Sequence, residues 1–128
     1  MGLKQTLQVM VVDDMATSRG LITQALDEIG ITNYDVANEG RMAIEKLAAK
    51  PVHLVISDYN MPGVDGLQLL EALRKHPGTQ RVGFILVTGR ADPELVERGQ
   101  KLALNNFLKK PFSTADLKTC IEQVFGRL

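Results

Sequence analysis

The sequence predicts an α/β fold in which a parallel sheet is covered by helices on both faces. Short apolar runs alternate five times with segments of helical periodicity, a pattern that favours right-handed strand–helix–strand units. The apolar runs are continuous and bounded by turn residues, which is typical of strands buried on both faces. The 128 residues correspond to one domain, without an internal repeat, linker or low-complexity tract.

Five strands are predicted, and four of them end at polar residues. The third is the most distinct, because residues 54–57 are apolar or β-favouring and lead directly into the lone carboxylate of Asp58. A turn rich in Pro and Gly follows, and helical periodicity resumes at Leu67. The predicted strands are residues 7–12, 34–37, 54–58, 82–87 and 104–108.

Each of the five predicted helices has one apolar stripe. The stripes are Leu21, Ile22, Ala25, Leu26 and Ile29; Met42, Ala43, Ile44, Leu47 and Ala48; Leu67, Leu70 and Leu73; Leu95, Val96 and Leu102; and Leu117, Cys120, Ile121, Val124 and Phe125. Gly30 is expected to end the first helix. Asn38, Asp65, Asp92 and Ser113 are expected to cap the starts of the other four.

The composition excludes several classes of protein. Fifteen basic and fifteen acidic residues give a formal net charge of zero, so no basic field indicates a nucleic-acid partner. No apolar run approaches the ~20 residues that span a bilayer, and the N-terminus lacks the layout of a secretion signal. A single cysteine, Cys120, rules out an internal disulfide. We therefore expect a cytoplasmic monomer that does not insert into a membrane.

Polar residues at the strand ends are expected to form one site. In a parallel sheet the carboxyl ends of the strands meet at one edge, where such folds bind ligands. Three neighbouring carboxylates repel one another unless a hard divalent cation such as Mg²⁺ lies among them. A threonine hydroxyl and a lysine nearby would stabilise an added anion. This combination suits phosphoryl transfer to a carboxylate. The residues are Asp13 and Asp14, Asp58, Thr88, and Lys109 or Lys110.

These motifs resemble those of the response-regulator receiver domain. They are Asp13-Asp14, the run Ser-Asp-Tyr-Asn-Met-Pro-Gly-Val-Asp-Gly around Asp58, Thr88-Gly89, and Lys110-Pro111-Phe112, in the family's order across essentially the whole chain. The resemblance implies a flavodoxin-like (βα)5 fold with the strand order 2-1-3-4-5 that is known for this class. It also implies a single receiver domain over residues 1–128 without an output domain, most similar to the single-domain chemotaxis type, CheY.

The resemblance implies roles for the acidic residues. Asp58 would accept a phosphoryl group from a sensor histidine kinase of the CheA-like kind. Asp13 and Asp14 would bind Mg²⁺, one of them partly through water. Asp58 and the main-chain carbonyl of Asn60 would complete the metal site.

The resemblance also implies a route from the site to a partner. Thr88 would swing to a phosphoryl oxygen, and Lys110, joined to Pro111 by a cis bond, would pair with that group. The family's switch position is Phe107 here, where the best-known chemotaxis receiver has tyrosine. Its ring can still rotate inward, but it has no hydroxyl for a partner. The output surface would be the fourth helix, fifth strand and fifth helix, and candidate partners are a flagellar motor switch protein and a phosphatase.

Two further residues are predicted to set the lifetime of the phosphorylated state. Asn60 lies two residues after Asp58 and Arg90 two residues after Thr88, so both flank the expected path of the hydrolytic water. Equal autodephosphorylation rates in the wild type and in swaps at both positions would refute this hypothesis.

Three alternatives differ in class or task. An aspartyl-phosphate phosphatase of the haloacid dehalogenase type has a second acid two residues after its nucleophile, and that position is Asn60 here. A flavodoxin-like FMN protein needs backbone donors where this chain has Asp13 and Asp14. A third option keeps the receiver but makes it a phosphate sink or a phosphorelay carrier. The resemblance implies a signalling protein of bacterial chemotaxis or flagellar motor control and not an enzyme, while the sequence cannot separate a motor-binding regulator from a sink or relay protein.

Overall fold

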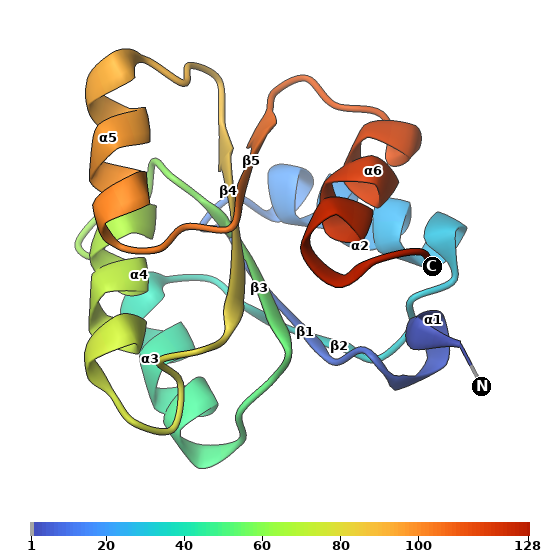
Figure 1. Ribbon diagram of the computed structural model, residues 1–128, viewed down its shortest axis with the longest axis horizontal. Helices are drawn as coiled ribbons and strands as arrows, with labels where there is room; N and C mark the ends of the chain where they lie inside the picture. The colour runs from blue at the N-terminus through green and yellow to red at the C-terminus, as the bar shows by residue number, and fades with distance from the viewer. Residues whose placement is uncertain (1) are drawn as a thin grey trace.

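A computed structural model describes residues 2–128, and within them it contains a five-stranded parallel sheet (Figure 1). The strand order is β2-β1-β3-β4-β5, and all four pairings are parallel. The predicted fold class and strand order are therefore confirmed. The elements in chain order are α1 (Leu3–Thr6), β1 (Val9–Val12), α2 (Ala16–Ile29), β2 (Tyr34–Ala37), α3 (Gly40–Ala49), β3 (Leu54–Asp58), α4 (Gly66–Lys75), β4 (Gly83–Thr88), α5 (Pro93–Lys101), β5 (Asn106–Lys109) and α6 (Thr114–Phe125).

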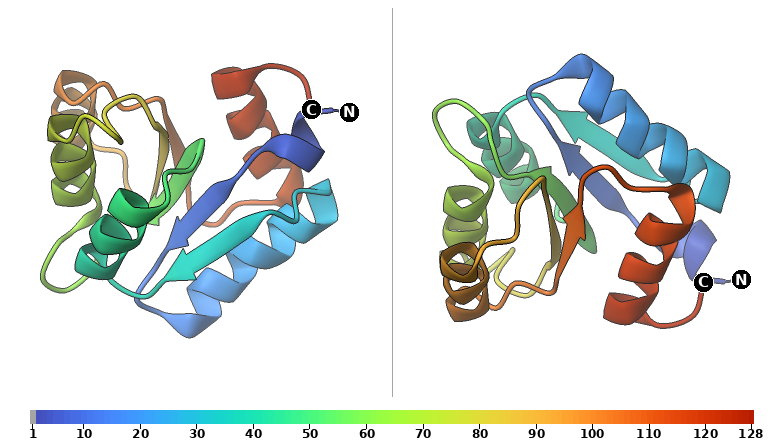
Figure 2. Two further views of the ribbon diagram at one scale, coloured as in Figure 1. Left: turned by 90° about the horizontal axis from the view of Figure 1, so that it is seen from below. Right: turned by 90° about the horizontal axis from the view of Figure 1, so that it is seen from above.

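Different helices cover the two faces of the sheet, as Figures 1 and 2 show. One core lies under α2 and α6 and contains Ile22, Leu26 and Ile56, and the other lies under α3, α4 and α5 and contains Leu70 and Phe84. Every residue of β1, β3 and β4 is buried. Polar side chains of these central strands can therefore reach solvent only at the strand ends.

Four predicted helix boundaries are confirmed by specific contacts. Asp65 and Ser113 each form a capping box with the third residue of their helix. Asp92 accepts a hydrogen bond from the first turn of α5, which starts with Pro93. Gly30 ends α2 at a φ of 103°, a left-handed conformation that glycine adopts without a steric penalty.

Two residues of the predicted apolar stripes do not face the core. Leu21 is 57% exposed, because the inward stripe of α2 begins one residue later, at Ile22. Ala48 is exposed near the end of α3. None of the helices over residues 2–128 combines the length and the apolar character that a membrane span requires.

The predicted cap of α3 at Asn38 is wrong. The residue at the cap position is Glu39, and its side chain accepts no hydrogen bond from the helix. Packing explains the start of α3 instead, because a Cβ on Gly40 would lie 2.8 Å from the Cβ of Val64. The first turn of α3 thus lies against the connection between β3 and α4.

Three strands begin later than predicted. β1 begins at Val9, and residues 3–6 form α1, which is too short to show helical periodicity. β4 begins at Gly83, one residue later than predicted, and ends at Thr88. β5 begins at Asn106, because Ala103 has a φ of 56° and turns the chain just before the strand.

The buried thiol of Cys120 should react slowly in the folded protein. Burial raises its pKa from 9.0 to about 11. Since the thiolate is the nucleophile, the reactive fraction at pH 8 falls about 100-fold. We expect an aromatic disulfide reagent at pH 8 to modify the urea-unfolded chain at least about 100-fold faster than the folded chain. Similar rates, corrected for the effect of urea on a free thiol, would contradict this prediction.

The same pKa gives a pH dependence of stability. Between about pH 9 and 11 the folded thiol keeps its proton while the unfolded thiol loses it, so the contribution to stability is lost as the pH rises through this range. Cys120→Ala should therefore show a smaller decrease in unfolding free energy over that range than the wild type.

Candidate functional site

The predicted acidic residues meet at the carboxyl edge of the sheet. Asp13 and Asp14 directly follow β1, and Asp58 ends β3. One carboxylate oxygen from each of the three lies within 4.8 Å of the others. Asp13 and Asp58 are buried and Asp14 is exposed, so the cluster faces solvent on the side of Asp14.

Asp58 is a buried carboxylate with one cationic partner. It is 6% exposed, and its Oδ1 lies 2.8 Å from the Nζ of Lys110. Burial raises the pKa of Asp58, the hydrogen bond and charge of Lys110 act in the opposite direction, and the carboxylates of Asp13 and Asp14 raise the pKa further. A second positive charge beside Asp58 would therefore favour its ionised, nucleophilic form.

Asp13 has a buried oxygen atom without a hydrogen-bond partner. Its side chain has no exposed surface, and its Oδ1 accepts a bond of 3.0 Å from the backbone N–H of Met15. Within the described residues, its Oδ2 has no partner. Buried polar atoms are nearly always bonded, so this oxygen marks a place for a ligand. An all-oxygen donor set of three carboxylates fits a magnesium ion.

The hydroxyl of Thr88 is hydrogen-bonded to the loop that follows β4. The Oγ1 donates to the carbonyl of Arg90 at 2.9 Å and accepts from the N–H of Arg90 at 3.2 Å. To bond a phosphoryl oxygen beside Asp58, the hydroxyl has to leave the Arg90 carbonyl. A Cβ on Gly89, the next residue, would meet no atom within 4 Å, so the space at that position is open.

The structure resolves the choice between two lysines that the strand pattern left open. Lys110 pairs with Asp58. Lys109, one residue earlier, lies opposite Thr88 in the sheet, is exposed and forms no ion pair within residues 2–128. The Lys110–Pro111 bond is cis, as expected.

Phe107 lies on the same face of the sheet as Thr88, as the predicted switch requires. Phe107 is opposite Leu86 in the sheet, and Thr88 lies two residues further along β4. The Phe107 ring is partly buried in the core under α5, and a Cβ on Gly99 of that helix would lie 3.2 Å from it. Movement of the ring stays a prediction, as do the roles of the exposed residues Asn60 and Arg90.

Gly66 supports the site and was missed by the sequence reasoning. A Cβ at this position would lie 2.6 Å from the main-chain carbonyl oxygen of Asp58, so only glycine lets the start of α4 come this close. The same carbonyl accepts a hydrogen bond of 2.9 Å from the Ser57 hydroxyl. The position of Gly66 directly after the capping residue Asp65 is the signal that could have indicated this contact.

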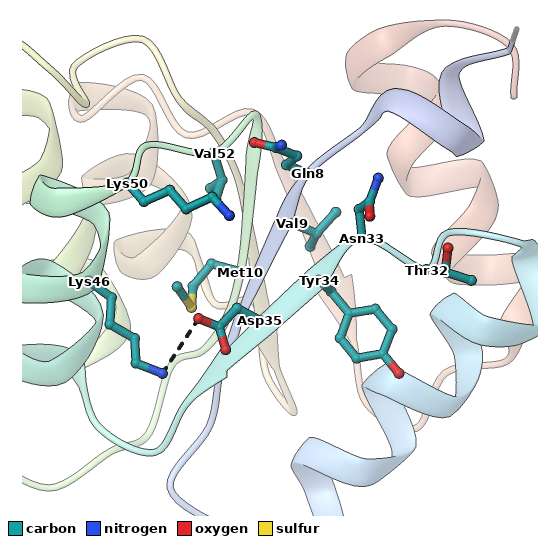
Figure 3. A pocket seen from close by; sticks show the side chains of 10 residues that line it. All are labelled: Gln8, Val9, Met10, Thr32, Asn33, Tyr34, Asp35, Lys46, Lys50 and Val52. Atoms are coloured by element: carbon teal, nitrogen blue, oxygen red, sulfur yellow. Dashed lines mark ion pairs between the residues drawn. The ribbon is translucent and has the colours of Figure 1, made fainter.

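A pocket lies at the amino ends of β1 and β2, away from the acidic residues at the carboxyl edge (Figure 3). Lys46 is already bonded within it: its Nζ donates to the carbonyl of Val36 at 2.7 Å and lies 3.6 Å from a carboxylate oxygen of Asp35. Lys46 thus has acceptors of its own, and among the described residues this pocket has no buried oxygen without a partner such as Oδ2 of Asp13. The carboxyl edge therefore remains the candidate functional site.

Comparison with known proteins defines the class of this protein. A family model of the response regulator receiver domain matches residues 9–122. The chain therefore belongs to the response regulator receiver family.

More particularly, its relatives include chemotaxis proteins of the CheY type. The chain is 41% identical over 128 residues to a probable chemotaxis protein CheY of Rhizobium etli, covering 100% of this chain and 99% of the relative. It is 29% identical over 126 residues to the chemotaxis protein CheY-3 of Vibrio cholerae, covering 98% and 97% of the two chains. The solved structure of Vibrio cholerae CheY4 matches with a TM-score of 0.86 at 26% identity, over 92% of this chain and 98% of that one. These comparisons confirm the predicted resemblance.

Proposed function

We propose that the chain is a response regulator that accepts a phosphoryl group on Asp58 from a sensor histidine kinase in a magnesium-dependent reaction. The observation that carries this proposal is the environment of Asp58. Its carboxylate is buried beside those of Asp13 and Asp14 and lies 2.8 Å from the ammonium group of Lys110. Membership of the receiver family supports the same assignment.

The chemistry follows from these contacts. A carboxylate oxygen of Asp58 attacks phosphorus, and a P–O bond forms while the P–N bond to the donor imidazole breaks and leaves its electron pair on nitrogen. Lys110 offers its positive charge to the phosphoryl oxygens, and Thr88 leaves Arg90 to donate a hydrogen bond to one of them.

Magnesium would be held by the three carboxylates and the main-chain carbonyl of Asn60, and when bound it would neutralise charge on the transferred group. The residues of the chain then have two tasks. Asp58 supplies the acceptor oxygen. Asp13 and Asp14 keep a compact set of oxygen ligands beside it, which positions donor and acceptor for transfer.

The proposed output is bacterial chemotaxis or flagellar motor control. Thr88 and Phe107 would transmit phosphorylation to the surface of α5, β5 and α6, where a flagellar motor switch protein or a phosphatase would bind. The identity of 41% to a probable CheY supports this assignment. In this proposal residues 1–128 act as a receiver, and Asn60 and Arg90 set the lifetime of the acyl phosphate.

Mass spectrometry after incubation with acetyl phosphate and magnesium tests the proposal. We expect the wild type to gain the mass of one phosphoryl group, because acetyl phosphate supplies the same reactive phosphorus as a phosphohistidine. Asp58→Asn and removal of magnesium with EDTA should each abolish the gain. The control Asp35→Asn removes an exposed carboxylate from the opposite end of the sheet and should phosphorylate normally. A gain that survives in Asp58→Asn would falsify the assignment.

A further inference from the structure

The guanidinium of Arg74 on α4 joins two connections of the chain. An arginine side chain has five N–H donors in a planar fork. All five are used here, and every acceptor is a neutral oxygen. Nε donates to the carbonyl of Leu102 (3.0 Å), Nη1 to those of Gln80 (3.1 Å) and Val82 (2.7 Å), and Nη2 to the carbonyl of Ala103 (3.0 Å) and to Oδ1 of Asn105 (3.3 Å).

This cation has no acidic partner among residues 2–128. Burial lowers the pKa of Arg74, yet the guanidinium stays charged at any physiological pH. The end of α5 compensates the positive charge of the guanidinium, because Leu102 and Ala103 supply carbonyls at the negative end of that helix dipole. The α5–β5 connection therefore solvates Arg74, and Arg74 in turn fixes that connection.

The α5–β5 connection also forms part of the wall around Phe107. A Cβ on Gly99 would lie 2.8 Å from the side chain of Leu104 and 3.2 Å from the Phe107 ring. Both side chains therefore pack against α5 at Gly99. Asn105 joins the connection to β4, because its Oδ1 accepts from the N–H of Phe84 at 2.8 Å. The position of the wall thus depends on contacts made from α4 and from β4.

The connection contains a strained residue. Ala103 has a φ of 56°, a left-handed conformation that is unfavourable for a residue with a Cβ. Its carbonyl is one of the acceptors of Arg74, so the guanidinium helps to keep this turn in place.

We propose that Arg74 is a positioning residue for the switch. By tying the C-terminal end of α5 to α4, it keeps the wall behind Phe107 in one place, so that a change at Thr88 moves the ring between two defined positions. Without Arg74 the wall loosens, and the ring samples both positions before phosphorylation. This inference rests on the proposed phosphorylation of Asp58.

Fluorine NMR of 4-fluorophenylalanine-labelled protein tests this inference. The chain has four phenylalanines, and Phe107→Leu identifies the resonance of position 107. The spectra are recorded with and without acetyl phosphate and magnesium, and mass spectrometry of the same samples gives the occupancy of Asp58. In Arg74→Gln, the displacement of the Phe107 resonance at matched occupancy should fall at least about twofold, since less population remains to be shifted.

Two variants separate positioning from a general loss of stability. Arg81→Gln removes an exposed arginine and should keep the full displacement. Arg74→Lys keeps the charge but has one nitrogen and no planar fork, so it should lose the displacement as Arg74→Gln does, and it replaces that variant if the glutamine protein does not fold. A purely structural role would lower the melting temperature and leave the displacement unchanged.

The outcomes separate a failure of the role of Arg74 from a failure of the proposed phosphorylation of Asp58. If the wild type gains no phosphoryl mass, the proposed function fails and the inference fails with it. If the wild type is phosphorylated but its Phe107 resonance does not move, or moves equally in the Arg74 variants at equal occupancy, only the inference is overturned.

Discussion

Lys110→Ala is expected to slow the phosphorylation of Asp58 by acetyl phosphate roughly 100-fold, the usual effect of removing one well-placed donor. The Nζ of Lys110 lies 2.8 Å from Oδ1 of Asp58 and is the one cation that forms an ion pair with it within residues 2–128. Its loss leaves Asp58 beside two other carboxylates, which raise its pKa and so reduce the ionised fraction. The rate of phosphoryl mass gain at fixed magnesium measures the effect.

Lys109→Ala is the matched control for this prediction. It removes the same side chain from the neighbouring position, where the lysine is exposed and has no ion pair among the described residues. It should phosphorylate at nearly the wild-type rate. Equal slowing in both variants would mean that general positive charge, and not the contact with Asp58, assists the reaction.

Asp13→Asn is expected to remove the effect of magnesium on stability. In the wild type, a ligand that binds the folded state at 100 times its Kd stabilises the fold by about 2.7 kcal/mol. The variant lacks the buried carboxylate whose Oδ2 has no protein partner, so its melting temperature should be nearly independent of magnesium. Calorimetric scans with and without magnesium measure the difference.

The same variant should be more stable than the wild type in EDTA. Asp13 has no exposed surface and lies in a cluster of three carboxylates, so removing its charge relieves repulsion worth about 1 kcal/mol or more. Glu71→Gln removes an exposed acid on α4 and is the control for a general change in charge. An Asp13→Asn protein that is stabilised by magnesium as strongly as the wild type would exclude Asp13 as a ligand.

The acidic site could be predicted because it depends on topology. Asp13, Asp14 and Asp58 follow apolar runs, and once the sheet is parallel its carboxyl ends must share one edge. The pattern could not show which of two consecutive lysines faces Asp58, since β5 ends at Lys109 and strand alternation does not extend to Lys110. The contacts that the α4–β4 and α5–β5 connections make in the folded chain could not be predicted either.

Arg74 and the close-packed glycines show why. The acceptors of Arg74 lie on two connections that come together only in the folded chain, so no local spacing predicts them. The need for glycine at positions 40 and 66 arises from Val64 and from the Asp58 carbonyl, through contacts that capping patterns do not contain. The periodicity and capping residues of a helix or strand predict that helix or strand alone. Arg74, Gly40 and Gly66 instead make contacts between different elements.

If Thr88 moves as proposed, its two hydrogen bonds with Arg90 set the free energy that phosphorylation has to overcome. A neutral hydrogen bond contributes a net 0.5–1.5 kcal/mol or so, and one to a charged acceptor about 1.5–3 kcal/mol. In the proposed function, a phosphoryl oxygen on Asp58 would therefore take the Thr88 hydroxyl from the Arg90 carbonyl by a small margin of free energy. So small a free-energy difference would still keep most of the unphosphorylated protein in the inactive conformation. It would also let the protein return to that conformation soon after its aspartyl phosphate is hydrolysed.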